Sequence, residues 1–185
     1  MWRRWWSLRD PSSRALGIIN GTEMTTLSTP AETSAALLKD RGETVGVAES
    51  STGGLISASL LAIPGASAYF LGGTIIYTLR ARRKLLGLEK SLLERQEPLS
   101  EEYVSLCART IRDQLRATWG LAELGATGPA GTPYGHPPGI CVLAVAGPVS
   151  LTRRIETGSA DREANMDIFM RGAFELFQQA IEHAA

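Results

Sequence analysis

A run of hydroxyl and glycine residues, Glu-Ser-Ser-Thr-Gly-Gly at positions 49–54, is the stretch best suited to chemistry. It follows an apolar run at positions 44–48 and precedes an amphipathic segment. A buried strand that stops at Ser50 and then opens a helix leaves backbone N–H groups and hydroxyls unpaired at one edge of a sheet. Such an edge can bind an anion or hold a nucleophile. The same residues could instead cap a helix and relieve packing, and the local pattern leaves both interpretations open.

A second turn-forming stretch occupies positions 127–139, after an apolar run that ends at Ala126. It reads TGPAGTPYGHPPG, and its glycines and prolines are incompatible with regular structure. Because the carboxyl ends of parallel strands meet at one edge of a sheet, we expect the two glycine-rich stretches to face each other. Together they would offer N–H donors to a phosphate, or to the oxyanion formed in acyl transfer.

Several familiar site patterns are absent from the sequence. Neither the dinucleotide-binding glycine pattern nor the P-loop occurs, and the Gly-x-Ser-x-Gly pattern of many hydrolases is missing. The only histidines are His136 and His183, which excludes a histidine-rich metal site, and we expect neither metal nor cofactor. His136 lies in the second glycine-rich stretch, where it is either a ligand contact or a solvated loop residue.

Composition indicates one ordinary globular domain. The chain has 185 residues, of which 44% are hydrophobic. Lys plus Arg equals Asp plus Glu, 19 each, so no net charge favours nucleic acid. No apolar run approaches the roughly 18 residues that cross a bilayer, so we expect no membrane partner and a cytoplasmic location. Cys107 and Cys141 have no CxxC spacing and are interpreted as core residues of a reducing compartment.

The first 26 residues differ from the rest in composition. They contain three of the four tryptophans and four arginines. An Arg-rich, acid-poor N-terminus is typical of an organellar presequence, although Asp10 and Pro11 interrupt the pattern. We therefore predict an extension over positions 1–26, either disordered or a targeting segment, and a folded domain over positions 27–185.

Helical and strand patterns alternate along that domain. Helices are expected over positions 30–41 with Thr29 as N-cap, 53–63, 80–86, 101–115 with Ser100 as N-cap, and from 161 onward. Strands are expected over positions 44–50, 68–77, 120–126, 140–147 and 150–157. Gly72 and Gly73 indicate either a bulge or a close backbone approach. Positions 89–98 read as a charged connector. This order predicts an α/β fold with helices on both faces of a sheet, and ligands at the carboxyl ends of its strands.

These motifs, in this order, resemble the CinA C-terminal domain family, the nicotinamide-nucleotide amidohydrolases. The resemblance rests on positions 48–88, which include AESSTGG, and on PLSEE, GATGPAG and PPG further along the chain. It runs from about Thr29 to the last residue and matches the stand-alone form, without the molybdopterin-binding-like domain of longer CinA proteins. The resemblance implies a three-layer α/β/α sandwich with a central mixed, largely parallel sheet.

The resemblance also implies a reaction, hydrolysis of the carboxamide of nicotinamide mononucleotide to an acid and ammonia without a metal. The family pattern A-E-S-C-T-G-G places the nucleophile at Ser50, with Ser51 in place of the cysteine. A family tyrosine maps to Tyr77, and the lysine that acts as base is replaced by Arg82. Arginine stays protonated in proteins, so it should not take the serine proton. Lys84, two residues further along a helix, would face away.

This replacement leaves two functions open. One is a mononucleotide amidohydrolase with Ser50, Tyr77 and Arg82 at its catalytic positions. The other is a non-catalytic module that binds a nucleotide or phosphate, because an arginine suits phosphate better than proton abstraction. The expected ligand-binding residues are Glu49, Ser51, Thr52, Gly53, Gly54, Gly125, Thr127, Gly128, Gly131 and Arg162, and Glu49 is expected to orient its loop. The resemblance is also compatible with a homodimer.

Overall fold

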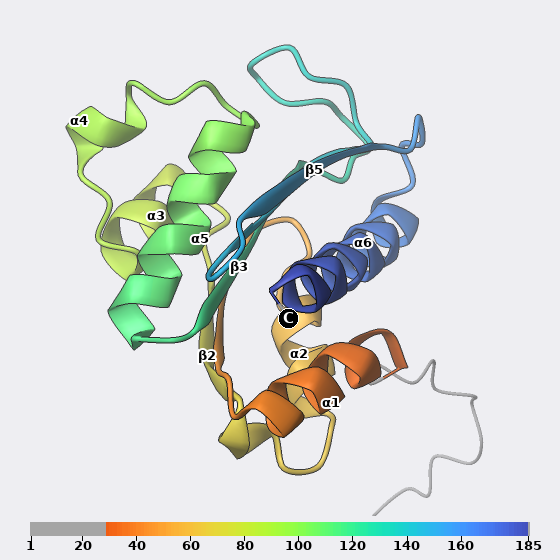
Figure 1. Ribbon diagram of the computed structural model, residues 1–185. Coiled ribbons are helices and arrows are strands. Elements are labelled where there is room, and N and C mark those ends of the chain that lie inside the picture. Colours follow the sequence, from red (N-terminus) through yellow and green to blue (C-terminus); the bar gives the residue numbers. More distant parts are fainter. Residues whose placement is uncertain (1–28, 185) are drawn as a thin grey trace, which may run out of the picture.

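The computed structural model describes residues 29–184, which form three layers with a five-stranded sheet in the middle (Figure 1). The strands are β1 (Val45–Glu49), β2 (Phe70–Ile75), β3 (Trp119–Ala126), β4 (Ile140–Ala146) and β5 (Leu151–Glu156). Helices α1 (Glu32–Arg41), α2 (Leu55–Leu61) and α6 (Arg162–His183) cover one face. Helix α5 (Glu101–Leu115) covers the other, together with the short helices α3 (Leu79–Leu85) and α4 (Lys90–Leu93). The predicted extension over positions 1–26 lies outside the described residues.

The strand pairing brings several loops to one edge of the sheet. The strand order is β2-β1-β3-β4-β5. Strand β1 pairs in parallel with β2 and β3, whereas β4 is antiparallel to β3 and β5. Strands β1, β2, β3 and β5 therefore end at the same edge, and the segments that follow them meet there. The prediction of a three-layer sandwich with a mixed sheet is confirmed, and all strands except β4 run in one direction.

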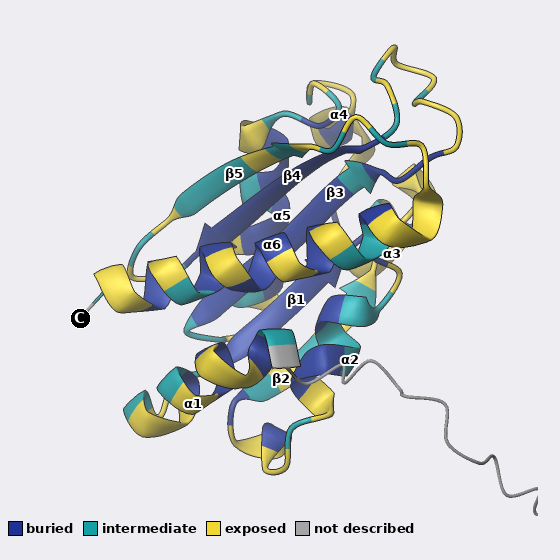
Figure 2. Cartoon of the chain, turned by 90° about the vertical axis from the view of Figure 1, so that its right-hand side faces the viewer, coloured by how far each residue is buried: buried dark blue, intermediate teal, exposed yellow. Residues whose placement is uncertain are grey.

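Burial on both faces explains the unbroken apolar runs in the sequence. Every residue of β1 and β4 is buried, because helices lie in front of and behind the sheet (Figure 2). Gly120 in β3 allows α5 to approach closely, since a Cβ at this position would clash with the carbonyl oxygen of Ala108. On the opposite face, Trp119 packs edge-on against Phe177 of α6, with ring centroids 5.9 Å apart.

Most element boundaries follow from local capping signals. Gly42 ends α1 in the left-handed conformation with φ of 63°, as predicted. Ser100 caps α5 by accepting a hydrogen bond from the N–H of Tyr103. The predicted cap at Thr29 is wrong, because a 3-10 turn over Thr29–Ala31 precedes α1 and puts Ala31 at the cap position.

Strand β2 is irregular near its start. The bulge, one of the two alternatives predicted for this strand, is confirmed, since the register skips a residue between Phe70 and Gly72. A short second 3-10 turn, Ala66–Ala68, leads into this strand.

The segment predicted as a charged connector contains α4, whose Leu93 is buried in the core beside α5. Two adjacent leucines, Leu92 and Leu93, in an otherwise polar segment give no period that would mark a helix.

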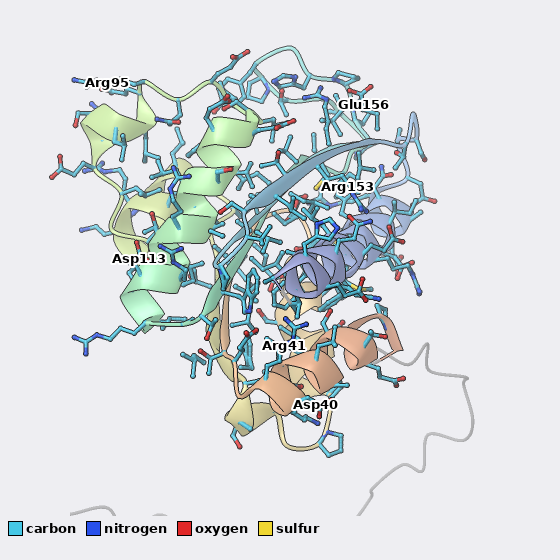
Figure 3. The ribbon with its side chains drawn as sticks, in the orientation of Figure 1. Asp40, Arg41, Arg95, Asp113, Arg153 and Glu156 are labelled. Carbon is cyan, nitrogen blue, oxygen red and sulfur yellow. The ribbon has the colours of Figure 1, made fainter. Side chains whose placement is uncertain are left out.

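Ion pairs at the surface contribute little to the fold. Asp40, Arg95 and Asp113 lie on the outside of the molecule (Figure 3). The ion pairs formed among residues 29–184 join at least partly exposed partners, and such pairs contribute about 0–1 kcal/mol each.

Both cysteines are buried and unpaired, as predicted, and burial raises the pKa of the Cys107 thiol to about 12. Within the described part of the chain, no helix is both long and apolar enough to span a membrane.

Candidate functional site

A cavity of about 310 Å³ opens at the edge of the sheet where β1, β2 and β3 end. Its lining comes from the turn after β1, the segment that joins β2 to α3, helix α3 itself, and the segment just before α5. The end of β3, the loop after it and the first residue of α6 complete the lining. Two guanidinium groups, those of Arg82 and Arg162, belong to this lining. None of the described lining residues is Asp or Glu, so the cavity favours an anionic ligand.

The structure brings eight of the predicted site residues together in this cavity. Those that line it are Ser50, Tyr77, Arg82, Gly125, Thr127, Gly128, Gly131 and Arg162. The other predicted residues lie outside the lining, in or beside the turn after β1: Glu49, Ser51, Thr52, Gly53 and Gly54. The two glycine-rich stretches do meet, because Ser50 of the first and Thr127, Gly128 and Gly131 of the second line the same cavity.

A buried carboxylate on β3 fixes the turn that carries Ser50. Oε2 of Glu123 accepts hydrogen bonds from the backbone N–H of Ser50 at 2.9 Å and of Thr52 at 3.1 Å. Oε1 accepts the Ser51 hydroxyl at 2.5 Å. Sequence reasoning missed Glu123, and the available signal was a lone glutamate inside an otherwise apolar strand. Because hydrogen bonds to a charged group stabilise by about 1.5–3 kcal/mol each, the backbone of Ser50 has a fixed position.

A second buried carboxylate, Glu49, holds the start of α2. It accepts hydrogen bonds from the backbone N–H groups of Gly54, Ile56 and Ser57, at 3.0 to 3.1 Å. It also accepts the hydroxyl groups of Thr52 and Ser57, at 2.8 and 2.6 Å. The N–H donors at the start of this helix therefore bind a carboxylate of the protein itself. Glu49 thus orients the turn, and these donors do not face the cavity.

The Ser50 hydroxyl, unlike those of Ser51 and Thr52, is not bound to any buried carboxylate of the described residues. Residue 50 lines the cavity although only 4% of its surface is exposed. Its hydroxyl forms no hydrogen bond with any other residue in the range 29–184, whereas those of Ser51 and Thr52 are bound to carboxylates. The turn therefore presents one hydroxyl to the cavity and turns the other two inward.

Side chains at the start of α6 hold the loop that follows β3. Nδ2 of the buried Asn165 donates hydrogen bonds to the carbonyl oxygens of Thr127 at 2.8 Å and Ser159 at 2.9 Å. Nη1 of Arg162 donates to the carbonyl oxygen of Gly128 at 2.7 Å. Arg162 therefore has a structural partner and also borders the cavity. Asn165 was not anticipated from the sequence, where it is one polar residue in a helical pattern.

Arg82 is held in place on the opposite side of the cavity. Its Nε donates to the carbonyl oxygen of Ile76 at 3.1 Å, and its Nη1 donates to the hydroxyl of Tyr103 at 2.9 Å. The guanidinium also lies over the Tyr103 ring, 5.2 Å from the centroid. Burial raises the pKa of the Tyr103 phenol, and the Arg82 cation partly opposes this rise. Arg82 is thus a positioned, permanently charged donor.

The usual proton acceptors are missing from the described lining. Lys84 is exposed and lies outside the cavity, as its helical position predicted. His136 also lies outside the lining, with its Nε2 3.1 Å from the carbonyl oxygen of Pro98. Tyr77, which the resemblance places among the catalytic residues, lines the cavity and is 56% exposed. Residues 29–184 also contain no cluster of three or more His, Cys, Asp or Glu suited to a metal ion.

Fold and site together define an α/β/α domain with a ligand cavity at the carboxyl edge of a mixed sheet, beside a serine on a glycine-rich strand-to-helix turn. The model of the CinA C-terminal domain matches residues 27–181. The chain therefore belongs to the CinA C-terminal domain family, and the resemblance seen in the sequence is confirmed.

Known relatives agree with this assignment. A CinA-like protein of Prochlorococcus marinus (strain MIT 9313) is 45% identical over 112 residues, which is 60% of this chain and 26% of that protein. One from Gloeobacter violaceus is 39% identical over 128 residues, 69% of this chain and 30% of that protein. The chain thus spans 26% to 30% of the length of these relatives.

Solved structures show the same fold. A competence-damaged protein (CinA) superfamily protein from Klebsiella pneumoniae superposes with a TM-score of 0.79 at 26% identity, covering 85% of this chain and 98% of that one. The competence/damage inducible protein CihA from Agrobacterium tumefaciens gives a TM-score of 0.77 at 27% identity, with 88% and 99% covered. These structures support the fold, and their names state no reaction.

Proposed function

We propose that the cavity binds a pyridine mononucleotide and that Ser50 hydrolyses its carboxamide to a carboxylic acid, with release of ammonia. The observation that carries this proposal is the Ser50 hydroxyl, which borders the cavity without a partner among the described residues. It shares this cavity with Tyr77 and with the guanidinium groups of Arg82 and Arg162. The choice of reaction follows the resemblance to the amidohydrolases of the family.

The chemistry would take two steps. Oγ of Ser50 gives up its proton and attacks the carboxamide carbon, the C–N bond breaks, and the departing nitrogen takes up one proton in exchange and leaves as ammonia. Water then hydrolyses the ester on Ser50 and releases the acid. The backbone N–H groups of Thr127 and Gly128, both in the lining, donate no hydrogen bond within the described residues. They are available to the developing oxyanion or to the phosphate of the ligand.

The charges of the cavity suit a nucleotide phosphate. Arg82 and Arg162 are its only charged lining residues in the described range. Two of the Arg82 donors are already engaged by Ile76 and Tyr103, so the group has a fixed direction and keeps further N–H donors for a ligand. A volume of about 310 Å³ lies within the usual range for small-molecule sites.

Removal of the Ser50 proton is the step that should limit the rate of this reaction. With Arg82 permanently charged, the described lining offers only tyrosines for this step, beside water from the solvent. Phenols are almost fully protonated at neutral pH. We therefore expect slow turnover that increases with pH, as a larger share of phenolate or hydroxide becomes available.

Ammonia release from nicotinamide mononucleotide tests the proposal. The native protein should release ammonia, and Ser50→Ala should abolish the release. Ser59→Ala is a matched control, because the Ser59 hydroxyl donates to the Leu55 carbonyl within α2 and lies away from the cavity. Release from the native protein no greater than from Ser50→Ala would refute the reaction.

The anchored Arg82 favours a second candidate, a site that binds the mononucleotide without turnover. An arginine fixed by a carbonyl and a phenol can hold a phosphate but cannot take a proton. Calorimetry with nicotinamide mononucleotide, run beside the ammonia assay, separates the two candidates. Binding without ammonia release supports the second candidate, and Ser50-dependent release refutes it.

A further inference from the structure

An exposed tyrosine stands at the rim of the cavity on the loop after β3. Tyr134 lines the cavity although 57% of its surface is exposed, and Thr132 and Pro133 beside it also belong to the lining. None of the contacts that hold the catalytic turn involves this side chain. Its ring is therefore free to contact a ligand.

Hydrogen bonds between Thr132, Gly135 and His136 close the backbone around Tyr134 into a turn. The N–H of Thr132 donates to the carbonyl oxygen of His136 at 2.8 Å, and the N–H of His136 donates to Oγ1 of Thr132 at 3.1 Å. The N–H of Gly135 donates to the carbonyl oxygen of Thr132 at 3.1 Å. The contact between the His136 ring and the Pro98 carbonyl ties this turn to the segment before α5. Tyr134 is thus presented by a preorganised turn, which lowers the entropy cost of binding.

The surroundings place this ring on the Arg82 side of the cavity. The Tyr134 phenol is near enough to Tyr103 to contribute to the raised pKa of that buried phenol. Tyr103 in turn holds the guanidinium of Arg82. Tyr134 and Arg82, a candidate phosphate donor, therefore belong to one cavity.

A pyridinium ligand would bring a positive charge into this cavity, and the Tyr134 ring can attract that charge. The ring of an oxidised pyridine nucleotide carries a positive charge, whereas the charged groups of the lining are two cations, Arg82 and Arg162. No carboxylate of residues 29–184 lines the cavity to balance that charge. The negative face of an aromatic ring attracts a cation although the ring carries no net charge. A planar ring also stacks well on that face.

We propose that Tyr134 is the specificity residue for the ligand's ring, on which a planar pyridinium stacks while the phosphate faces the arginines. This inference rests on the proposed function, because the mononucleotide supplies the pyridinium. It predicts that the site distinguishes the oxidised, cationic ring from the reduced, neutral ring. It also predicts that affinity for a ribose phosphate without a ring does not depend on Tyr134.

Calorimetry on two variants tests this role. Tyr134→Leu should weaken binding of oxidised nicotinamide mononucleotide by about 5- to 30-fold, the range expected for loss of a partly desolvated cation–π contact. Tyr134→Phe keeps the ring and should stay within about threefold of the native protein. The reduced mononucleotide should lose less affinity in Tyr134→Leu than the oxidised form. Binding of ribose 5-phosphate should be unchanged in both variants.

The outcomes separate this inference from the proposed function. If the native protein binds the oxidised mononucleotide and Tyr134→Leu binds it equally well, the stacking role is wrong and the proposed function stands. An equal loss of ribose 5-phosphate affinity would also overturn the stacking role, since Tyr134 would then only shape the cavity. If the native protein binds no mononucleotide at all, the proposed function and this inference fail together.

Discussion

Glu123 offers the sharpest test of how the fold holds the turn that carries Ser50. Its carboxylate accepts hydrogen bonds from the backbone N–H groups of Ser50 and Thr52 and from the Ser51 hydroxyl. The Thr52 hydroxyl is 2.9 Å from it but shares its one proton with Glu49. Glu123→Gln preserves the shape of the side chain but removes its charge and one acceptor. We expect a protein that still folds, with a loosened turn after β1.

The expected cost follows from these contacts. The bonds from the two backbone N–H groups end on Oε2, and a glutamine oxygen can keep them as neutral hydrogen bonds. Each change from a charged to a neutral acceptor loses about 1 kcal/mol. Glutamine avoids part of the cost of burying a carboxylate, so Glu123→Gln should lower the free energy of unfolding by about 1–3 kcal/mol. Glu123→Ala leaves two buried N–H groups without this acceptor and should cost about 2–6 kcal/mol.

Urea unfolding followed by circular dichroism measures these differences. Glu175→Gln is the matched control, because the Glu175 carboxylate is exposed and pairs with Arg153 on the surface. Its effect should stay below about 1 kcal/mol. Affinity for the mononucleotide should fall in Glu123→Gln and stay unchanged in Glu175→Gln. A Glu123→Gln protein with native stability and native affinity would show that this carboxylate does not hold the turn.

Three further predictions concern Arg82, Tyr103 and the buried thiols. Arg82→Lys should raise ammonia release at least tenfold at neutral pH, because a general base typically contributes about 10²–10⁴-fold; an unchanged rate in the ammonia assay would mean that residue 82 does not limit proton removal. Tyr103→Phe removes the 2.9 Å bond to Arg82 and should weaken mononucleotide binding by about 2- to 10-fold in calorimetry, whereas native affinity would argue that this bond does not position Arg82. Burial raises the pKa of Cys107 from 9.0 to about 12, so between these pH values the native thiol keeps a proton that the unfolded thiol has lost. The free energy of unfolding should therefore fall by about 1.4 kcal/mol per pH unit from this group, and urea titrations of Cys107→Ala should show a shallower fall.

Much of the fold could be predicted because its signals are local. Glycine after the last turn of α1 and serine before α5 mark helix ends from neighbouring residues alone. The apolar runs of β1 and β4 indicate strands covered on both faces, as the structure shows. The order of these elements then fixes which loops share an edge of the sheet. The location of Ser50 beside the second glycine-rich loop follows from the same reasoning.

The contacts that position the site could not be predicted in this way. Glu123 lies 73 residues from Ser50, and Asn165 lies 38 residues from the Thr127 carbonyl that it holds. Hydrogen bonds between such distant segments depend on side-chain directions that no local period encodes. The same limit explains why the N–H groups of Gly54 looked suited to a ligand. Only the fold shows that the Glu49 carboxylate binds them.

A crystal structure of Ser50→Ala with bound nicotinamide mononucleotide tests the central claim most directly. We predict that the ligand fills the cavity at the carboxyl edge of the sheet, with its carboxamide carbon about 3–3.5 Å from the position that the Ser50 hydroxyl oxygen occupies in the native protein. The phosphate should lie about 3 Å from a guanidinium nitrogen of Arg82 or Arg162. A carboxamide that faces away from residue 50, or a ligand seated instead in the groove between α3 and α4 beside Arg83 and Lys84, would contradict the account.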